Sequence, residues 1–232
     1  MIQLPLSVAL RDDANFENFY VNSNALLVEK ILQSTQHNAV DGAIFFWGEI
    51  ASGKTHLLQA VCDKVAKRNL TAAYIPLTLW QELDVKMLHG MESFAAICVD
   101  DIDSIAGQIK WEKALFELYN RATENNTQMY FSATRSVKEI PFKLADLSSR
   151  LSWGFVFHLR ALTDEEKPKA LQAHAKGRGF EMPDNVARYL LNHYPRDMNG
   201  LSQLLERLDK ASLAAQRKLT LPFVKQWLSH SL

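Results

Sequence analysis

The sequence GEIASGKT, which occupies Gly48 to Thr55, decides the fold because it stands between an apolar run ending at Trp47 and a helix-forming run beginning at His56. It fits the pattern GxxxxGK[ST], in which glycines let the backbone turn its N–H groups toward a phosphate. The start of the following helix adds partial positive charge. A surface turn before a helix is the competing interpretation, and the strand–loop–helix context disfavours it. The stretch therefore predicts a phosphate-binding loop.

Residues of this loop have distinct predicted roles. Lys54 would reach the β- and γ-phosphates of a nucleotide, and Thr55 would bind Mg²⁺ through its hydroxyl. The predicted nucleotide-binding positions are Gly48, Ala51, Ser52, Gly53, Lys54, Thr55 and His56. The expected cofactors are therefore ADP or ATP, together with Mg²⁺.

A second apolar run, Ala95 to Val99, ends in two carboxylates, Asp100 and Asp101. Aspartate pairs at strand ends are common in solvated loops, so the pattern alone is a weak signal. It follows the phosphate loop by one strand–helix unit, however, as the acidic half of a nucleotide site should. Asp100 would then hold the Mg²⁺ shell, and Asp101 would orient or deprotonate the attacking water. The two motifs together predict a nucleotide-binding site.

Short apolar runs alternate with helix-periodic segments through the middle of the chain. The expected strands are Ala43–Trp47, Ala72–Ile75, Ala95–Val99, Met129–Ala133 and Phe155–Leu159. Strands that are apolar throughout, and that alternate with helices, indicate a parallel sheet covered on both faces. The expected fold class is α/β, with a five-stranded parallel sheet.

After about residue 160 the pattern becomes helical only. Thr163 and Glu166 can form a capping box, Pro183 suits the start of a helix, and Thr220 with Pro222 can start a last one. We therefore expect a flexible N-terminal arm over 1–14, a nucleotide-binding α/β domain over 15–160, and a small helical lid domain over 161–232.

Composition narrows the class of partner. The 26 basic and 26 acidic residues cancel, which disfavours a protein that binds DNA or an anionic membrane directly. Residues 1–10 lack the charged start and cleavage site of a signal peptide, and no apolar stretch is long enough to span a bilayer, so a cytoplasmic protein is expected. Cys62 and Cys98 lie in apolar runs and are expected to be buried thiols. Trp47 and Trp153 are expected to be core or packing residues.

Several further segments resemble the DnaA family of AAA+ proteins, and within it the Hda-type homologues. The resemblance covers nearly the whole chain. The segments that carry it are Asn15–Phe19 with Ser23-Asn24, Asp100–Ile102, Phe116–Asn120, Ser132–Arg135, Ser149–Gly154, Gly179–Pro183 and Arg217–Val224. It implies an AAA+ domain in which Phe16 and Phe19 pack around the adenine.

The same resemblance implies a role for Arg150, in a segment similar to the family's arginine-finger box. There the arginine points away from its own nucleotide and stabilises charge on a phosphoryl group held by a neighbour, an effect worth roughly 10³–10⁵ in rate in known cases. The implied target is ATP bound to DnaA. A homo-oligomer is left open, because AAA+ sites are usually completed at subunit junctions.

At the N-terminus, Gln3-Leu4-Pro5-Leu6-Ser7-Val8 resembles a peptide that binds the DNA polymerase sliding clamp. Gln3 would hydrogen-bond the rim of an apolar pocket filled by Leu6 and Val8, with Leu4 beside them. Val8 stands where a larger Leu or Phe is usual, which indicates a weaker anchor. No helix-turn-helix domain is expected after residue 232, so DNA would be reached only through the clamp.

Two positions depart from the family pattern. Thr134 occupies the sensor I position, where Asp or Asn is common, and Asn199 occupies the nucleotide-contacting sensor II position, where arginine is expected. Without that arginine, a charge-assisted contact to the γ-phosphate is missing. We therefore expect a weak ATPase at most, which binds ADP at least as well as ATP.

The function expected from the resemblance is negative regulation of replication initiation, by stimulating hydrolysis of DnaA-bound ATP from a position on the clamp. One alternative is a helicase-loader or clamp-loader type AAA+ subunit, which would not explain the peptide Gln3–Val8. The other is an autonomous P-loop ATPase or kinase, although the arginines after residue 160 form no evident clamp for a second substrate.

Overall fold

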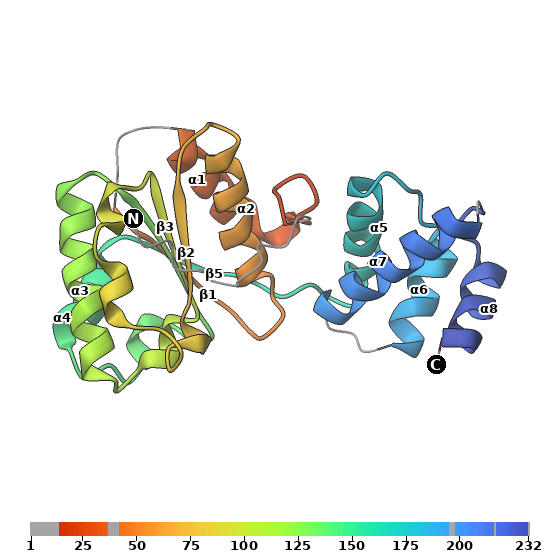
Figure 1. The fold of residues 1–232 in the computed structure, drawn as a ribbon. Coiled ribbons are helices and arrows are strands. Elements are labelled where there is room, and N and C mark those ends of the chain that lie inside the picture. Colours follow the sequence, from red (N-terminus) through yellow and green to blue (C-terminus); the bar gives the residue numbers. More distant parts are fainter. Residues whose placement is uncertain (1–13, 37–41, 195–197, 216, 232) are drawn as a thin grey trace.

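Five parallel strands form one sheet at the centre of the larger domain (Figure 1). The computed structural model describes residues 14–36, 42–194, 198–215 and 217–231. The strands, in the spatial order β2-β3-β4-β1-β5, are β1 (Ile44–Trp47), β2 (Ala72–Pro76), β3 (Ala96–Asp100), β4 (Gln128–Ala133) and β5 (Phe155–His158). The expected α/β fold class with a five-stranded parallel sheet is confirmed, and each strand lies within one residue of its expected run.

Two helices cover each face of the sheet. On one face lie α1 (Ala25–Gln36) and α2 (Lys54–Ala66), and on the other lie α3 (Ile109–Glu124) and α4 (Ala145–Trp153). Every residue of β3 and β4 is buried, which explains why these strands are apolar almost throughout instead of alternating. Connecting segments contain the 3-10 helices η1 (Asn22–Asn24), η2 (Leu77–Leu79), η3 (Val85–Leu88), η4 (Met91–Ser93), η5 (Ile102–Ile105) and η6 (Val137–Glu139).

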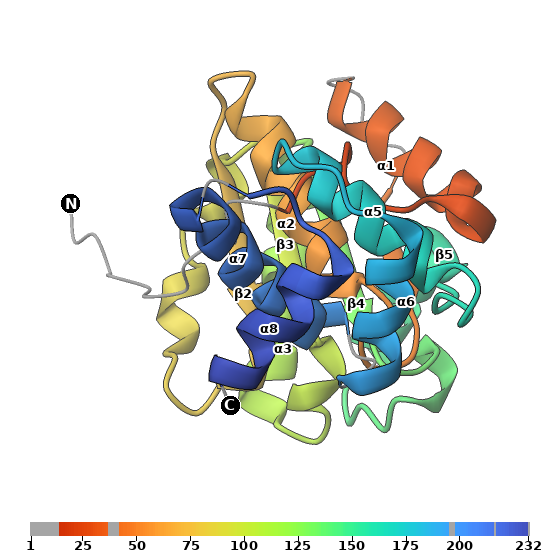
Figure 2. The same cartoon turned by 90° about the vertical axis from the view of Figure 1, so that its right-hand side faces the viewer.

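A separate group of helices follows the sheet and forms the lid: α5 (Lys167–Gly177), α6 (Asp184–His193), α7 (Met198–Ala215) and α8 (Leu221–Ser231). The apolar residues of the lid form a hydrophobic cluster of their own, centred on leucines of these helices. Seen from the lid side, the four helices lie in front of the sheet (Figure 2). The backbone N–H of Thr163 donates to Glu166 Oε2 at 2.8 Å just before α5, and Pro183 directly precedes α6.

The N-terminal segment connects the two groups of helices. Asn24 Nδ2 donates to the carbonyl of Arg160 at 3.0 Å, and the N–H of Arg160 donates to Asn24 Oδ1 at 2.9 Å. Asn18 is buried, and a methyl group added at Gly177 of α5 would lie 3.2 Å from its Cβ. Residues before α1 therefore contact both the end of the sheet and the lid.

The two cysteines, Cys62 and Cys98, are buried free thiols, as expected. Trp47 packs partly buried against the core, but the expectation for Trp153 is wrong because this residue is 80% exposed. None of the helices in the described ranges is long and apolar enough to cross a membrane.

Candidate nucleotide-binding site

The phosphate loop joins the carboxyl end of β1 to the first turn of α2. Gly53 precedes the helix with φ +103°, and Ala51 also has a positive φ, of +63°. Gly48 is required for a different reason: a Cβ there would lie 2.3 Å from the backbone oxygen of Leu159. The glycines therefore serve a left-handed turn at one position and a close backbone contact at the other.

Lys54 lies inside this loop, with only 6% of its surface exposed. Its ammonium group donates to the carbonyl oxygens of Gly48 and Glu49, both at 2.9 Å. Ser52 Oγ is buried and has no hydrogen-bond partner among the described residues. A cation held among backbone groups at a helix N-terminus, with an unused hydroxyl beside it, is chemically suited to nucleotide phosphates.

Asp100, at the end of β3, accepts hydrogen bonds from three hydroxyl groups. Thr55 Oγ1 and the Tyr74 hydroxyl each donate to Asp100 Oδ2 at 2.7 Å, and Ser132 Oγ donates to Asp100 Oδ1. Burial, and then the neighbouring Asp100, raise the pKa of Tyr74 well above its ordinary value, so the phenol stays a donor. Sequence reasoning had placed Thr55 and Asp100 together at the metal but had missed Tyr74.

Asp101 follows at the mouth of the site and has a left-handed backbone, with φ +52°. Its N–H donates to Ser132 Oγ at 2.9 Å. Burial first, then the charges of Asp100 and Asp103, raise the pKa of Asp101 to about 6, while Lys54 opposes the shift. A carboxyl group with a pKa near neutrality can accept a proton from water, so its chemistry fits the expected role.

Thr134, the residue at the expected sensor I position, lines the cleft beyond β4. Its hydroxyl donates to Asp103 Oδ2, and its N–H donates to the same oxygen at 3.2 Å. The hydroxyl is thus engaged by a carboxylate of the protein. Asp103, which sequence reasoning did not single out, is the partner that holds it.

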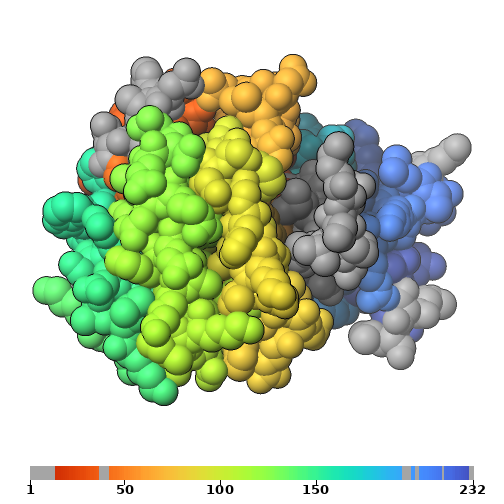
Figure 3. Space-filling model, turned by 60° about the vertical axis from the view of Figure 1, so that its left-hand side comes forward, coloured from red at the N-terminus to blue at the C-terminus, as the bar shows by residue number. Residues whose placement is uncertain are grey.

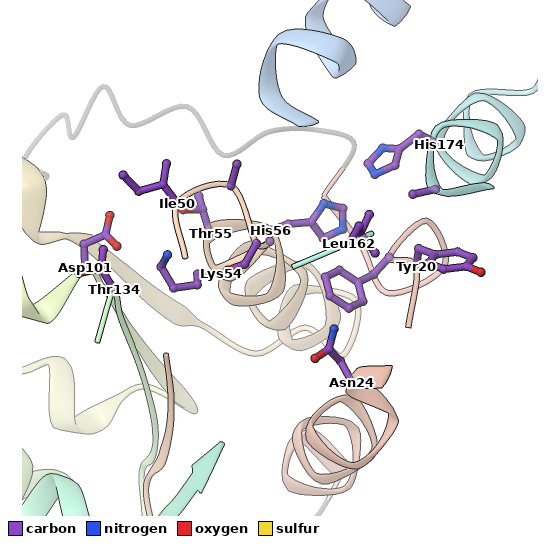
Figure 4. Close-up of a pocket in the computed structure, with 15 residues that line it drawn as sticks. Tyr20, Asn24, Ile50, Lys54, Thr55, His56, Asp101, Thr134, Leu162 and His174 are labelled. Carbon is purple, nitrogen blue, oxygen red and sulfur yellow. The ribbon is translucent and has the colours of Figure 1, made fainter. Parts of the chain in front are cut away.

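Lys54, Thr55, Asp101 and Thr134 line one cleft of about 230 Å³ between the sheet and the lid. Asp100 does not itself line the cleft but is bonded to Thr55, which does. Figure 4 shows Asp101 and Thr134 at one end, Lys54 and Thr55 in the middle, and Tyr20, Leu162 and His174 toward the other. The first end carries the charged and hydroxyl groups. The second end, which also contains Phe19, Asn24 and Ala170, is largely aromatic and apolar, as a base-binding end should be.

His56 connects the two ends of the cleft. Its ring lies 5.4 Å from that of Phe19 and 5.4 Å from that of His174, the latter in an edge-on arrangement. His56 Nε2 is also 2.9 Å from the carbonyl oxygen of Asn15. The first turn of α2 is thereby in contact with the N-terminal segment and with lid helix α5.

Other expected site residues lie elsewhere. Phe16 does not line the cleft but packs, partly buried, against the cluster under α1 and α2. Gln3, Leu4, Leu6 and Val8, and the side chain of Asn199, lie outside the described part of the chain. Tyr20, Leu162, Ala170 and His174 were not foreseen, because they reach the cleft only through the packing of separate segments.

Arg150 is in the last turn of α4, away from the lining of the cleft. Its guanidinium lies over the ring of the exposed Trp153, 5.4 Å from the ring centroid. In the space-filling view, α3 and α4 (green to blue-green) form a face on the side of the molecule away from the lid (blue; Figure 3).

The residues at the phosphate end fit a nucleotide with Mg²⁺. The donor set offers Lys54 and backbone N–H groups for phosphate, and the hydroxyl of Thr55 with the carboxylate of Asp100 for a hard cation that prefers oxygen. A parallel sheet in this strand order, with a phosphate loop after β1, acidic residues after β3 and a helical lid, defines an AAA+ domain.

Comparison with protein families identifies the AAA+ family to which the chain belongs. Residues 10–158 match the model of the bacterial DnaA ATPase domain, and residues 164–228 match that of the Hda lid domain. The chain belongs to the DnaA family of AAA+ proteins and carries an Hda-type lid.

The chain is also similar to individual proteins. An uncharacterized protein of Haemophilus influenzae is 42% identical over 228 residues, which cover 98% of each chain. Domain III of the Thermotoga maritima replication initiation protein DnaA superposes with a TM-score of 0.74 at 20% identity, over 95% of this chain and 97% of that one. AMPPCP-bound DnaA from Aquifex aeolicus has a TM-score of 0.70 at 20% identity, over 87% and 66% of the two chains. These two solved structures share the fold.

Proposed function

We propose that this protein is a nucleotide-bound negative regulator of replication initiation, which stimulates hydrolysis of ATP bound to DnaA. Membership of the DnaA family and the Hda-type lid support this function. The observation that carries the proposal is the position of Arg150, outside the lining of its own cleft and over a tryptophan that is 80% exposed. An arginine in this position is available to the nucleotide of a second molecule.

The protein's own nucleotide serves mainly to hold its conformation. AMPPCP binding by a DnaA of the same fold supports a nucleotide at the phosphate loop. The hydroxyl of Thr134 is already bonded to Asp103, and the sequence has Asn199 where an arginine would read the γ-phosphate. Both features favour ADP as the resident nucleotide and slow hydrolysis.

Binding to the sliding clamp is the second part of the proposal, and it rests on the sequence of the peptide Gln3–Val8. A clamp loaded on DNA would bring the regulator to places where replication has begun. DNA would then be contacted through the clamp, in keeping with the zero net charge of the chain.

Two alternative functions would use the same site differently. A helicase-loader or clamp-loader type subunit would use the cleft and Arg150 within an assembly of several AAA+ proteins, without acting on DnaA. An autonomous ATPase or kinase would turn over ATP by itself. The engaged Thr134 hydroxyl disfavours autonomous turnover, and the clamp-like peptide disfavours a loader.

The decisive measurement is ATP hydrolysis by DnaA in the presence of clamp-loaded DNA. The wild-type protein should accelerate hydrolysis, and Arg150→Ala should lose most of the acceleration, by a factor of about 10³ if the arginine acts as a finger. Arg188→Ala, which removes an exposed arginine paired with Asp184 on lid helix α6, is the matched control and should retain it. If the wild-type protein leaves hydrolysis unchanged, the proposed function is wrong.

A second arm separates docking from catalysis. Leu6→Ala should abolish clamp binding and the clamp-dependent acceleration, while nucleotide binding stays unchanged. Val8→Leu should bind the clamp more tightly than the wild type, because it restores buried apolar area. Equal clamp binding by all three proteins would exclude the peptide as the anchor.

A further inference from the structure

The buried carboxylate of Asp100 is held by several hydrogen bonds. Only 4% of Asp100 is exposed, and a buried charge is costly unless hydrogen bonds compensate it. Its Oδ2 atom accepts from Thr55 and Tyr74, and its Oδ1 atom accepts from Ser132. Three hydroxyl groups from three different elements therefore determine how this carboxylate is oriented.

Tyr74 reaches Asp100 from the neighbouring strand. In the parallel register of β2 and β3, Tyr74 is opposite Cys98, two residues before Asp100 on the same face. Its hydroxyl donates to Asp100 at 2.7 Å and is also hydrogen-bonded by the buried Gln59 of α2. The phenol has one hydrogen to donate, and that hydrogen is directed at the carboxylate.

Ser132 holds the other oxygen from the opposite side. It is fully buried on β4, donates to Asp100 Oδ1 and accepts from the N–H of Asp101. This serine therefore fixes the carboxylate of Asp100 and the backbone of Asp101 at once. Thr55 is different, because it lines the cleft, and its hydroxyl oxygen can bind a cation while its hydrogen is donated to Asp100.

We infer that Tyr74 and Ser132 are positioning residues that orient the Asp100 carboxylate for Mg²⁺ at the nucleotide. The hydroxyl groups of both residues donate to Asp100, so Tyr74 and Ser132 act through this carboxylate. Groups that orient a metal ligand in this way typically contribute about 10- to 100-fold to metal affinity. The inference rests on the Mg²⁺–nucleotide part of the proposed function and is independent of any action on DnaA.

The test uses the full chain and compares Tyr74→Phe with Tyr130→Phe. Tyr130 is the matched control, because it is also a strand tyrosine with a hydrogen-bonded hydroxyl, which lies 2.8 Å from that of Ser34, and it does not line the cleft. ADP affinity is measured by calorimetry in EDTA, and Mg²⁺ is then titrated at a fixed ADP concentration. Thermal unfolding of the nucleotide-free variants records stability.

Tyr74→Phe should raise the Mg²⁺ concentration at half-effect about tenfold, while its ADP affinity in EDTA stays within about twofold of wild type. Tyr130→Phe should leave both quantities unchanged. The inference would be overturned if Tyr74→Phe left the Mg²⁺ concentration at half-effect unaltered. Equal losses of ADP affinity with and without Mg²⁺ would also overturn it, because the hydrogen bond would then have only a structural role.

Ser132→Ala is the second variant and carries the same expectation, which keeps the test decisive if Tyr74→Phe folds poorly. A wild-type protein whose ADP binding does not respond to Mg²⁺ would also overturn the inference, and that result is visible before any variant is made. Failure of the DnaA hydrolysis assay alone would leave these titrations unaffected, so the two failures are distinguishable.

Discussion

The hydroxyl of Thr55 donates a hydrogen bond of 2.7 Å to the carboxylate of Asp100, across 45 residues of sequence. Thr55 is the second residue of α2, and Asp100 is the last residue of β3. Although β4 lies between β3 and β1 in the sheet, α2 packs against β3, and this packing brings the two residues together. The two halves of the nucleotide site are therefore joined by a direct hydrogen bond.

Thr55→Ala should remove this link and lower the affinity for ADP in Mg²⁺ about tenfold or more, because a metal ligand and its orienting bond are both lost. In EDTA the affinity should change little. Thr55→Ser keeps the hydroxyl and should behave as wild type in both solutions. Calorimetric titration checks the pattern, which fails if the serine variant loses as much affinity as the alanine variant.

Gly48→Ala should destabilise the protein severely and abolish nucleotide binding. The added Cβ would lie 2.3 Å from the oxygen of Leu159, and backbone must move to relieve such a contact. We expect a loss of about 3 kcal/mol or more in the free energy of unfolding, measured in urea. Gly90→Ala is the control: it meets no atom within 4 Å but has φ +83°, so only a conformational cost of about 1 kcal/mol applies. Similar losses in both variants would refute the steric argument.

Asp101→Asn should change how stability depends on pH in the metal-free, nucleotide-free protein. The pKa of Asp101 in the folded state, about 6, is above its ordinary value of 3.8. Its contribution to stability is therefore complete below about pH 4 and is lost as the pH rises through 6. The variant should be more stable than wild type at pH 7.5, by about 1 kcal/mol after allowance for solvent screening.

Near pH 4 that advantage should disappear. Urea unfolding of both proteins at the two pH values measures their free energies of unfolding. If the variant differed from wild type by the same amount at both pH values, the raised pKa of Asp101 would be contradicted. The same variant should hydrolyse less ATP than wild type, if the carboxylate acts on the attacking water.

His174→Ala should weaken ADP binding by about two- to tenfold, with and without Mg²⁺, because it removes the aromatic contact between the lid and His56. His193→Ala is the control: it removes a ring contact with Tyr189, at 4.1 Å, and neither residue lines the cleft. It should leave ADP affinity unchanged. A loss confined to Mg²⁺-containing buffer would place the effect of His174 at the phosphate end instead.

Trp153→Ala should leave the free energy of unfolding within about 0.5 kcal/mol of wild type, since the side chain is 80% exposed. Trp111→Ala, at a 4% exposed position of α3, should cost about 3–5 kcal/mol. Chemical denaturation compares the two. If Trp153→Ala also loses the acceleration of DnaA hydrolysis, then the tryptophan supports Arg150 at a contact surface.

Much of the fold was predictable because the local signals agree with one another. Continuous apolar runs located every strand, and the spacing of Trp111, Leu115 and Leu118 matches the buried face of α3. The order of the strands was not predictable from such runs, because the pairing of β1 with both β4 and β5 joins segments that are far apart in the sequence.

The candidate site was likewise predictable only in part. Lys54, Thr55, Asp100 and Asp101 belong to two short motifs and were found from the sequence. Tyr74 was missed because its ring reaches Asp100 diagonally from a different strand. His174 was missed because a lone histidine on an otherwise ordinary helix gives no local signal, and only the lid position brings it to His56.

The reciprocal pair of hydrogen bonds between Asn24 and the backbone of Arg160 has a mechanical consequence. The side chain of Asn24 pairs with the backbone just after β5, donating to one backbone group of Arg160 and accepting from the other, as a neighbouring strand does. A rotation of the lid is therefore expected to pivot after Arg160, beyond this pair of hydrogen bonds. The base end of the cleft can then widen or narrow while the phosphate loop keeps its shape.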